Sequence, residues 1–112
     1  MSFELFKLNN VNSKIPTKNP GDAGYDLASP IDADIELFSR KVVDTGVRME
    51  LPCLHSGLDL YGRICPRSGL AFETGIDGGG GVIDRSNTGS LGVIHFNHSK
   101  DSVHISKGDR IA

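Results

Sequence analysis

A chain of 112 residues with a formal net charge of -2 is the size of one small domain and leaves no room for a second. The near-balance of charge disfavours a nucleic-acid partner, because neutralising a phosphate backbone takes an excess of Lys and Arg. No apolar run is long enough to span a membrane, and residues 1–10 mix Glu4 and Lys7 into an apolar segment, unlike a signal peptide. Cys53 and Cys65 are too few for a disulfide framework and lack zinc-site spacing, so we predict buried, reduced thiols. We therefore expect a cytoplasmic or nuclear protein without a membrane partner.

Apolar segments of strand length alternate with turn signals along the chain, and glycine supplies 14 of the 112 residues. The segments expected to form strands are residues 3–8, 35–38, 43–51, 58–64, 91–96 and 103–105. In residues 43–51 apolar side chains occupy alternate positions, which predicts a half-buried strand. A helical turn or two is expected near residues 68–73, where Ser68 could cap the first turn. The pattern predicts an all-β fold, a sandwich, barrel or jelly roll, with at most one short helix.

The four histidines are interpreted as structural or surface residues. His95 and His98 have the spacing of a metal pair, but residues three apart on a strand point to opposite faces. Zinc is therefore disfavoured.

Four patches break the strand pattern, and each places a charged residue beside glycine. They are residues 23–27, 62–71, 81–84 and 108–112. Glycine permits close backbone approach to a ligand, while Arg, Ser and Asp supply phosphate donors, a hydroxyl and a base. Each patch alone is weak, because a run of four glycines is usually a flexible turn and no P-loop pattern is present. Together they suggest a nucleotide phosphate site.

The four patches, in this order, resemble the first four of the five motifs of the trimeric dUTPase family. The matching segments are Gly-Asp-Ala-Gly-Tyr-Asp-Leu (21–27), Tyr-Gly-Arg-Ile-Cys-Pro-Arg-Ser-Gly-Leu-Ala (61–71), Gly-Gly-Val-Ile-Asp (80–84) followed by Gly-Ser-Leu-Gly-Val-Ile-His-Phe-Asn (89–97), and Gly-Asp-Arg-Ile-Ala (108–112). The resemblance covers residues 15–112 and implies an all-β, dUTPase-like jelly roll of the β-clip type with mostly antiparallel strands. It also implies a homotrimer in which each active site takes its first, second and fourth motifs from one subunit and its third from a neighbour.

The activity that this resemblance implies is hydrolysis of dUTP to dUMP and pyrophosphate, which keeps uracil out of DNA and supplies dUMP for dTMP synthesis. Asp84 would be the general base that activates water for in-line attack on the α-phosphorus. Mg²⁺ would be the cofactor, with Asp26 holding it through water. Arg67, Ser68 and Gly69 would bind the phosphates, in part through main-chain amides at the start of the short helix.

The nucleoside would be bound mainly by backbone groups of the third motif and the strand that follows it. The residues implied for uracil and deoxyribose are Gly79, Val82, Ile83, Asn87 and Gly92. The slot would be too narrow for a 5-methyl group, so rejection of dTTP would be steric. Arg63, Asp109 and Arg110 would play supporting roles, with Arg63 ordering nearby carboxylates.

The sequence departs from the family pattern at two places. Ser86 and Asn87 stand where the family has an Asp-Tyr pair, whose ring packs on the deoxyribose. Loss of such an aromatic contact costs about 1 to 3 kcal/mol where bases stack, so we expect weaker binding and poorer rejection of ribose. The chain also ends at Ala112, within the fourth motif, without the last strand and glycine-rich tail that the family pattern contains. We expect an open sheet edge there and an incomplete lid.

Three alternatives stay open at the level of sequence. The first is a catalytically impaired relative that acts as a nucleotide-binding or protein-interaction module. The second is a deaminase of deoxycytidine nucleotides on a similar fold, and the third is a purely structural β protein. The retained Asp26, Arg67, Ser68 and Asp84 favour the hydrolase.

Overall fold

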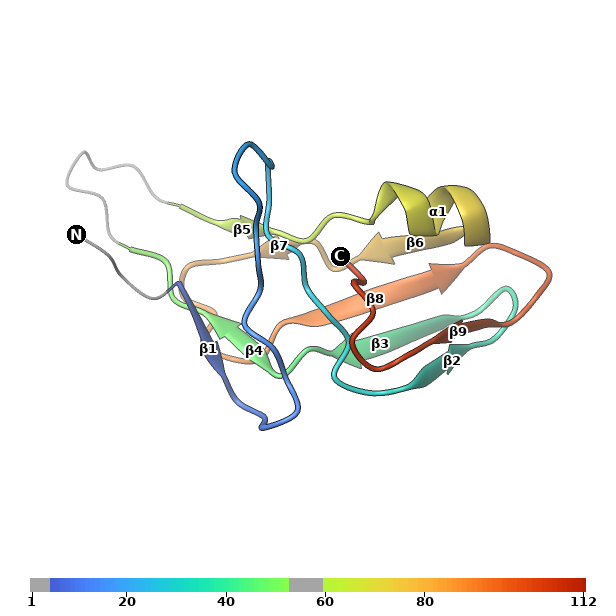
Figure 1. The fold of residues 1–112 in the computed structure, drawn as a ribbon, viewed down its shortest axis with the longest axis horizontal. Coiled ribbons are helices and arrows are strands. Elements are labelled where there is room, and N and C mark those ends of the chain that lie inside the picture. The colour runs from blue at the N-terminus through green and yellow to red at the C-terminus, as the bar shows by residue number, and fades with distance from the viewer. Residues whose placement is uncertain (1–4, 53–59) are drawn as a thin grey trace.

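The computed structural model describes residues 5–52 and 60–112, and their strands pair in four small antiparallel sheets (Figure 1). Three sheets have two strands each: β1 (Phe6–Leu8) with β4 (Val47–Met49), β2 (Ala33–Ile35) with β9 (Val103–Ile105), and β5 (Gly62–Arg63) with β7 (Val82–Ile83). The fourth has the order β3-β8-β6, with bounds Arg40–Asp44, Gly92–Asn97 and Ile76–Gly79. Within the described ranges the only helix is α1 (Ser68–Thr74), which is too short to cross a membrane. The prediction of a mostly antiparallel all-β fold with one short helix is confirmed.

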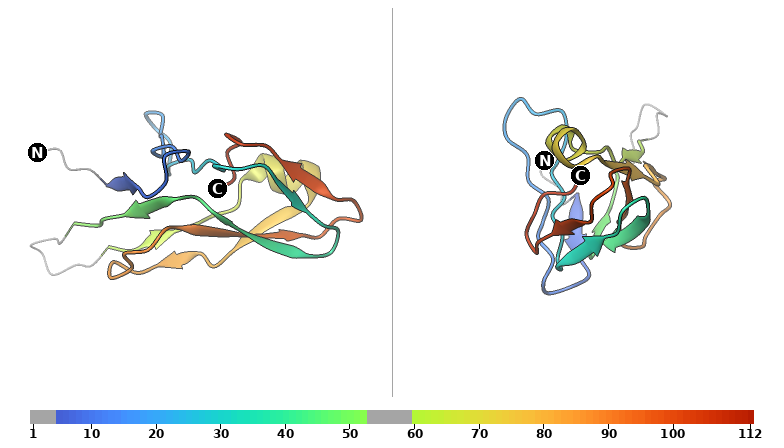
Figure 2. Two further views of the ribbon diagram at one scale, coloured as in Figure 1. Left: turned by 90° about the horizontal axis from the view of Figure 1, so that it is seen from below. Right: turned by 90° about the vertical axis from the view of Figure 1, so that its right-hand side faces the viewer.

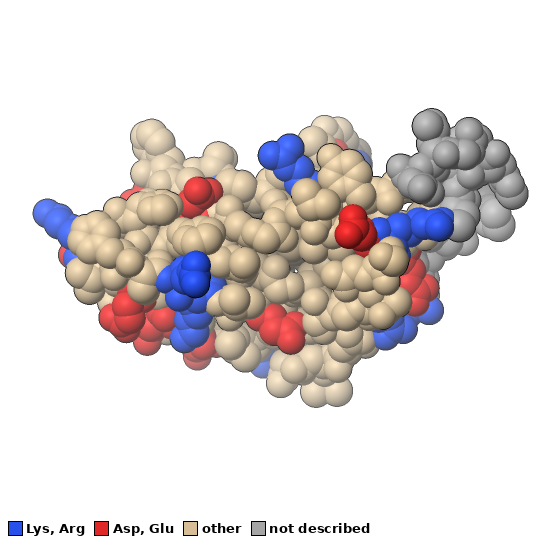
Figure 3. Space-filling view, turned by 180° about the vertical axis from the view of Figure 1, so that it is seen from behind, with Lys and Arg blue, Asp and Glu red and all other residues tan. Residues whose placement is uncertain are grey.

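One hydrophobic core joins these sheets, and viewed end-on the strands surround it (Figure 2). Its most deeply buried members come from different elements: Ile35, Val43, Ile76, Val93, Ile105 and Ile111. Strand β8 shows how alternation builds this core, because Val93, His95 and Asn97 are buried while the residues between them are only half-buried. On the described part of the face in Figure 3, charges of both signs are interspersed among uncharged side chains.

Residues 43–51 have buried side chains on the predicted face, but they form two strands and not one continuous strand. Val43, Thr45 and Val47 are buried, as the alternation indicates, whereas Met49 and Leu51 on the same predicted face are half-buried. The structure has two strands here, because Gly46 adopts a left-handed φ of 65° and ends the pairing of β3 with β8. Beyond this bend β4 pairs with β1 instead. Thr45 holds the bend by donating its hydroxyl to the Leu91 carbonyl at 2.7 Å.

Three other boundaries differ from those predicted. The strand expected at 35–38 ends at Ile35, since Phe38 lies in a turn with a φ of 50°. The strand expected at 58–64 is limited to Gly62–Arg63 among described residues, and residues 58–59 lie outside them. The glycine run 78–81 is expected to form a turn, because glycine has little intrinsic strand preference, but Gly78 and Gly79 are the last two residues of β6. Its pairing with β8 overrides that preference.

Two predictions about single side chains were wrong. Ser68 does not cap α1, since the residue at the N-cap is Arg67 and no side chain accepts a capping hydrogen bond. Cys65 is a free thiol that is exposed and not buried. It lies on the extended segment before α1, outside the core. Cys53 and His55 fall outside the described residues.

We expect Gly46→Ala to lower the free energy of unfolding by about 2 kcal/mol or more, because a non-glycine residue at positive φ is strained. The added Cβ would also overlap Ser13 Oγ and lie 2.9 Å from Asn10 Cβ. Urea unfolding at fixed protomer concentration measures this change. Gly24→Ala is the matched control, since its added Cβ meets nothing within 4 Å and its φ is not positive. Equal stability of both variants would contradict the role of the Gly46 bend.

Candidate active site

Three of the four patches meet at the carboxylate of Asp26. Arg67 Nη1 lies 2.5 Å from Asp26 Oδ1, and Arg110 Nη1 lies 3.5 Å from Asp26 Oδ2. The two arginines are 41 and 84 residues away from Asp26 in the sequence. Folding therefore gathers the first, second and fourth patches into one charged cluster, as the resemblance implies.

Backbone pairing places two of these groups. The amide of Asp26 donates to the Thr17 carbonyl at 2.8 Å, and Ala28 forms an antiparallel bridge with Arg110. Leu27 and Ile111 are both buried in the core, and Ile111 N donates to Leu27 O at 2.7 Å. The Asp26 segment and the Arg110 segment are thus held side by side by their main chains.

The predicted phosphate-binding residues lie at the start of α1. Arg67 is half-buried with an extended backbone, at φ -81° and ψ 131°. Ser68 and Gly69 are exposed, and a Cβ added at Gly69 would meet nothing within 4 Å. Because Ser68 caps no helix, its hydroxyl has no capping bond to lose when a ligand binds.

Asp84 follows β7 directly and is exposed to solvent. A tight turn comes after it, in which the Asn87 amide donates to the Asp84 carbonyl at 3.0 Å. Asn87 Oδ1 in turn accepts a hydrogen bond of 2.9 Å from the Gly89 amide. The side chain of Asn87 is thus used within its own loop.

Asp84 does not meet Arg67 within one chain. Gly62 pairs with Ile83 and Arg63 with Val82, so continuing the register places Asp84 beside Tyr61. From Arg63 toward Arg67 the two segments remain in contact. Ile64 N donates to Gly81 O at 2.7 Å. A Cβ added on Gly78 would lie 3.6 Å from the Pro66 nitrogen. Asp84 and Arg67 thus lie at opposite ends of this paired segment. Arg67 is six residues beyond Tyr61, a distance of about 20 Å along an extended chain.

The residues predicted to bind uracil line a place where two strands separate. The ladder between β6 and β8 ends where Gly79 faces Ile94. Gly80 then turns the chain with a φ of 68°, and β7 pairs with β5 (Figure 1). Among the described strands β7, which contains Val82, and β8, which begins at Gly92, belong to different sheets and are not paired with each other. Val82 is exposed, whereas the side chain of Ile83 belongs to the core.

Glycine is required at Gly79 by packing. A Cβ there would lie 2.5 Å from the ring of Phe96. The ring closes one side of the glycine segment, so a larger residue would push it aside.

The predicted supporting residues differ in what they contact. Arg110 binds Asp26, while Asp109 Oδ2 accepts the Ser106 amide at 2.9 Å and so stabilises the turn before it. Arg63 was expected to order carboxylates, but in this chain it forms no ion pair with any carboxylate of residues 5–52 or 60–112.

The Asp26 carboxylate does not fit the role of a direct ligand of Mg²⁺. In nucleotide sites Mg²⁺ takes one or two carboxylates together with phosphate and water oxygens. Each oxygen of Asp26 already faces a guanidinium group. Across the described chain, no group of three or more His, Cys, Asp or Glu side chains could hold a metal. The water-mediated metal role expected of Asp26 stays a prediction.

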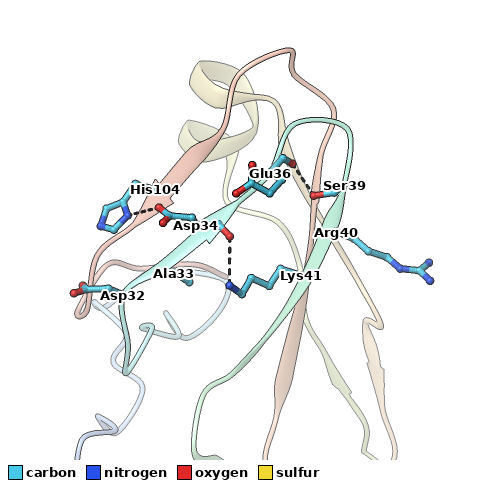
Figure 4. A pocket seen from close by; sticks show the side chains of 8 residues that line it. All are labelled: Asp32, Ala33, Asp34, Glu36, Ser39, Arg40, Lys41 and His104. Atoms are coloured by element: carbon cyan, nitrogen blue, oxygen red, sulfur yellow. Dashed lines mark hydrogen bonds and ion pairs between the residues drawn. The ribbon is translucent and has the colours of Figure 1, made fainter.

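Two hollows differ in their relation to the patches. A groove of about 540 Å³ lies beside the charged cluster and is lined mainly by apolar residues, among them Leu27, Ile64, Ile83 and Ala112. A polar hollow of about 600 Å³ lies elsewhere, over β2, β3 and β9 (Figure 4). In it His104 Nδ1 lies 2.6 Å from Asp34 Oδ1. Because none of the four patches lines this polar hollow, we assign the candidate site to the first region.

We expect the pKa values of the two histidines in the described strands to be shifted in opposite directions. The hydrogen bond with Asp34 raises the pKa of His104, whereas burial lowers the pKa of His95. For His104 the pair stabilises the fold fully below the unfolded pKa of about 6.5, and this contribution is lost as pH rises through the higher folded pKa. NMR titration of the imidazole resonances measures both values. Asp34→Asn should return the pKa of His104 toward 6.5 and leave that of His95 in place, and an unchanged His104 would contradict the assignment.

The antiparallel strands around one core, with an arginine pair and a separate exposed carboxylate at the surface, define the class of protein: an all-β domain with a charged site suited to an anionic ligand. The family model for dUTPase matches residues 12–112. The deoxyuridine 5'-triphosphate nucleotidohydrolase of Monkeypox virus is 43% identical over 124 residues, covering all of this chain and 78% of the viral protein. That of vaccinia virus (strain Copenhagen) is 46% identical over 101 residues, covering 89% of this chain and 65% of the viral protein. The chain belongs to the dUTPase family, and it spans 65% to 78% of the length of these two relatives.

Solved structures confirm the jelly roll of the dUTPase type. The Staphylococcus bacteriophage 80alpha dUTPase superposes with a TM-score of 0.86 at 26% identity, covering 96% of this chain and 84% of the phage chain. Two variants of that phage enzyme contain dUpNHpp, one with an aspartate changed to asparagine and one with a tyrosine changed to phenylalanine three positions later.

Proposed function

We propose that this protein, assembled with copies of itself, hydrolyses dUTP to dUMP and pyrophosphate. The observation that carries the proposal is the separation of Asp84 from Arg67 along one paired segment. Both belong to patches that the dUTPase resemblance places in one active site. We infer that a site containing both groups forms between chains, and their separation within one chain supports a homotrimer with active sites at subunit boundaries.

The proposed chemistry is in-line attack of water on the α-phosphorus. Asp84 accepts a proton from the water, whose oxygen forms the new bond to phosphorus. The bond from the α-phosphorus to its bridging oxygen breaks, and pyrophosphate leaves with the electron pair. An exposed position after β7 suits Asp84 for this role, because its carboxylate can face a ligand on a neighbouring subunit.

Arg67, Ser68 and Gly69 bind the phosphates in this proposal. Arg67 brings charge and several N–H donors, and the exposed Ser68 hydroxyl and main-chain amides add neutral donors. The backbone around Gly79, Val82 and Gly92 reads uracil where the strands separate. Family membership leads us to expect Mg²⁺ as the cofactor, held largely by the phosphates of the substrate and by water. We place the activity in the cytoplasm or nucleus.

Asp84→Asn and Arg67→Ala should each reduce kcat for dUTP by about 100-fold or more, since each removes a group that acts at the reacting phosphate. Mixing equal amounts of the two inactive variants, by refolding or co-expression, should restore about one quarter of the wild-type activity. In a ring of shared sites, random assembly gives about one site in four an intact Arg67 from one subunit and an intact Asp84 from its neighbour. Pyrophosphate release measures turnover.

Asp101→Asn is the matched control for Asp84→Asn, because Asp101 is also exposed and only its main chain forms hydrogen bonds. It should keep wild-type turnover. Absence of recovery in the mixture would show that Asp84 and Arg67 do not share a site across subunits. Tight binding of dUTP by the wild type without turnover would favour the alternative, a catalytically impaired nucleotide-binding module.

Asn87 stands three positions after Asp84, the same spacing as the aspartate and tyrosine substituted in the phage enzyme. We expect Asn87→Tyr to lower KM for dUTP and to increase the preference for dUTP over UTP by about 1 kcal/mol or more, through packing of the ring on the sugar. Competition kinetics with both nucleotides measures this. Asn87→Ala is the control, because it also loses the hydrogen bond to Gly89 but gains no ring. If both variants behave alike, the sugar does not contact this position.

A further inference from the structure

We propose that Asp26 is a positioning residue, which holds Arg67 and Arg110 as one pair for binding phosphate, and that it is not the carboxylate of a metal site. The inference rests on the proposed function for the identity of the ligand, a nucleoside triphosphate. It assigns the fourth patch to the same anion site through the side chain of Arg110.

The contacts divide the carboxylate between the two arginines. Arg67 approaches Oδ1 at 2.5 Å, and Arg110 approaches Oδ2 at 3.5 Å. The Asp26 side chain is 26% exposed and that of Arg67 is 33% exposed, whereas that of Arg110 is 61% exposed. The carboxylate thus lies below the two guanidinium groups, of which Arg110 reaches furthest into solvent.

The main chain gives this arrangement a fixed base. Asp26 is anchored by its hydrogen bond to Thr17, and the bridge between Ala28 and Arg110 sets the two segments in register. Leu27 N also donates to Ala112 O at 2.9 Å. The carboxylate is therefore placed by backbone pairing, and it can orient long side chains that would otherwise sample many rotamers.

Charge favours phosphate over a metal ion at this place. One carboxylate and two guanidinium groups leave a net charge of +1, which attracts a triphosphate and repels a divalent cation. A guanidinium carries five N–H donors, so each arginine keeps donors for phosphate while one contacts Asp26. A metal bound through Asp26 would have to displace or face both arginines.

Asp26→Asn tests whether Asp26 positions the arginines, because the loss of its charge and the loss of a positioning contact change anion affinity in opposite directions. Removing a negative charge beside two arginines would by itself tighten anion binding, whereas loss of a positioning contact weakens it. We expect binding of inorganic pyrophosphate in EDTA, measured by calorimetry, to weaken about tenfold. KM for dUTP should rise by a similar factor, while the Mg²⁺ concentration that gives half the maximal rate changes less than about twofold. Asp34→Asn is the charge-matched control and should leave all three quantities unchanged.

Two results would overturn the proposal. One is unchanged or tighter pyrophosphate binding by a folded Asp26→Asn variant, and the other is a large rise in the Mg²⁺ requirement with normal pyrophosphate binding. If Asp26→Asn does not fold, Arg110→Gln decides, because its side chain is mostly exposed. It should weaken pyrophosphate binding in EDTA without altering the Mg²⁺ requirement, and unchanged binding would refute the arginine pair. Since the calorimetry needs no turnover, its outcome is independent of whether the protein hydrolyses dUTP.

Discussion

The antiparallel pairing of the segment around Gly62 with the segment around Ile83 is the constraint on which the rest of the site depends. This ladder acts as a spacer, because hydrogen-bonded strands neither shorten nor slide without flipping every side chain to the other face. It sets the carboxylate of Asp84 at one end and the guanidinium of Arg67 at the other. No change of rotamer closes such a gap, so folding of one chain yields two separate halves of the proposed active site, which the proposed assembly would join.

The two halves are built in different ways. Asp84 is held locally, by a turn whose hydrogen bonds span only a few residues around Asn87. The arginine half depends on tertiary contacts, since Asp26 meets partners 41 and 84 residues away. Partly exposed ion pairs of this kind contribute little to stability. Their value here is geometric, because they fix where donors point.

Sequence patterns predicted burial better than they predicted connectivity. Alternation identified Val43, Thr45 and Val47 as core residues, but it could not show that Gly46 redirects the chain to a new partner strand. Strand β6 escaped prediction because its stability comes from pairing with β8 and not from its glycines. Within the site, the motifs identified Asp26, Arg67 and Arg110 separately. The resemblance placed their motifs in one site, but the contacts of Asp26 with both arginines needed the structure, since contacts over such sequence distances leave no local pattern.

A phosphate site that contains two arginines has to solve a problem of its own before any ligand arrives. Two guanidinium groups repel each other, and in the empty site nothing would keep both directed at the same point. A single carboxylate between them offsets this repulsion and still leaves one unit of positive charge for the ligand. A second carboxylate would neutralise the pair, and a metal ion would restore the repulsion. The position of Asp26 between Arg67 and Arg110 is therefore more readily explained by the needs of anion binding than by those of a cation.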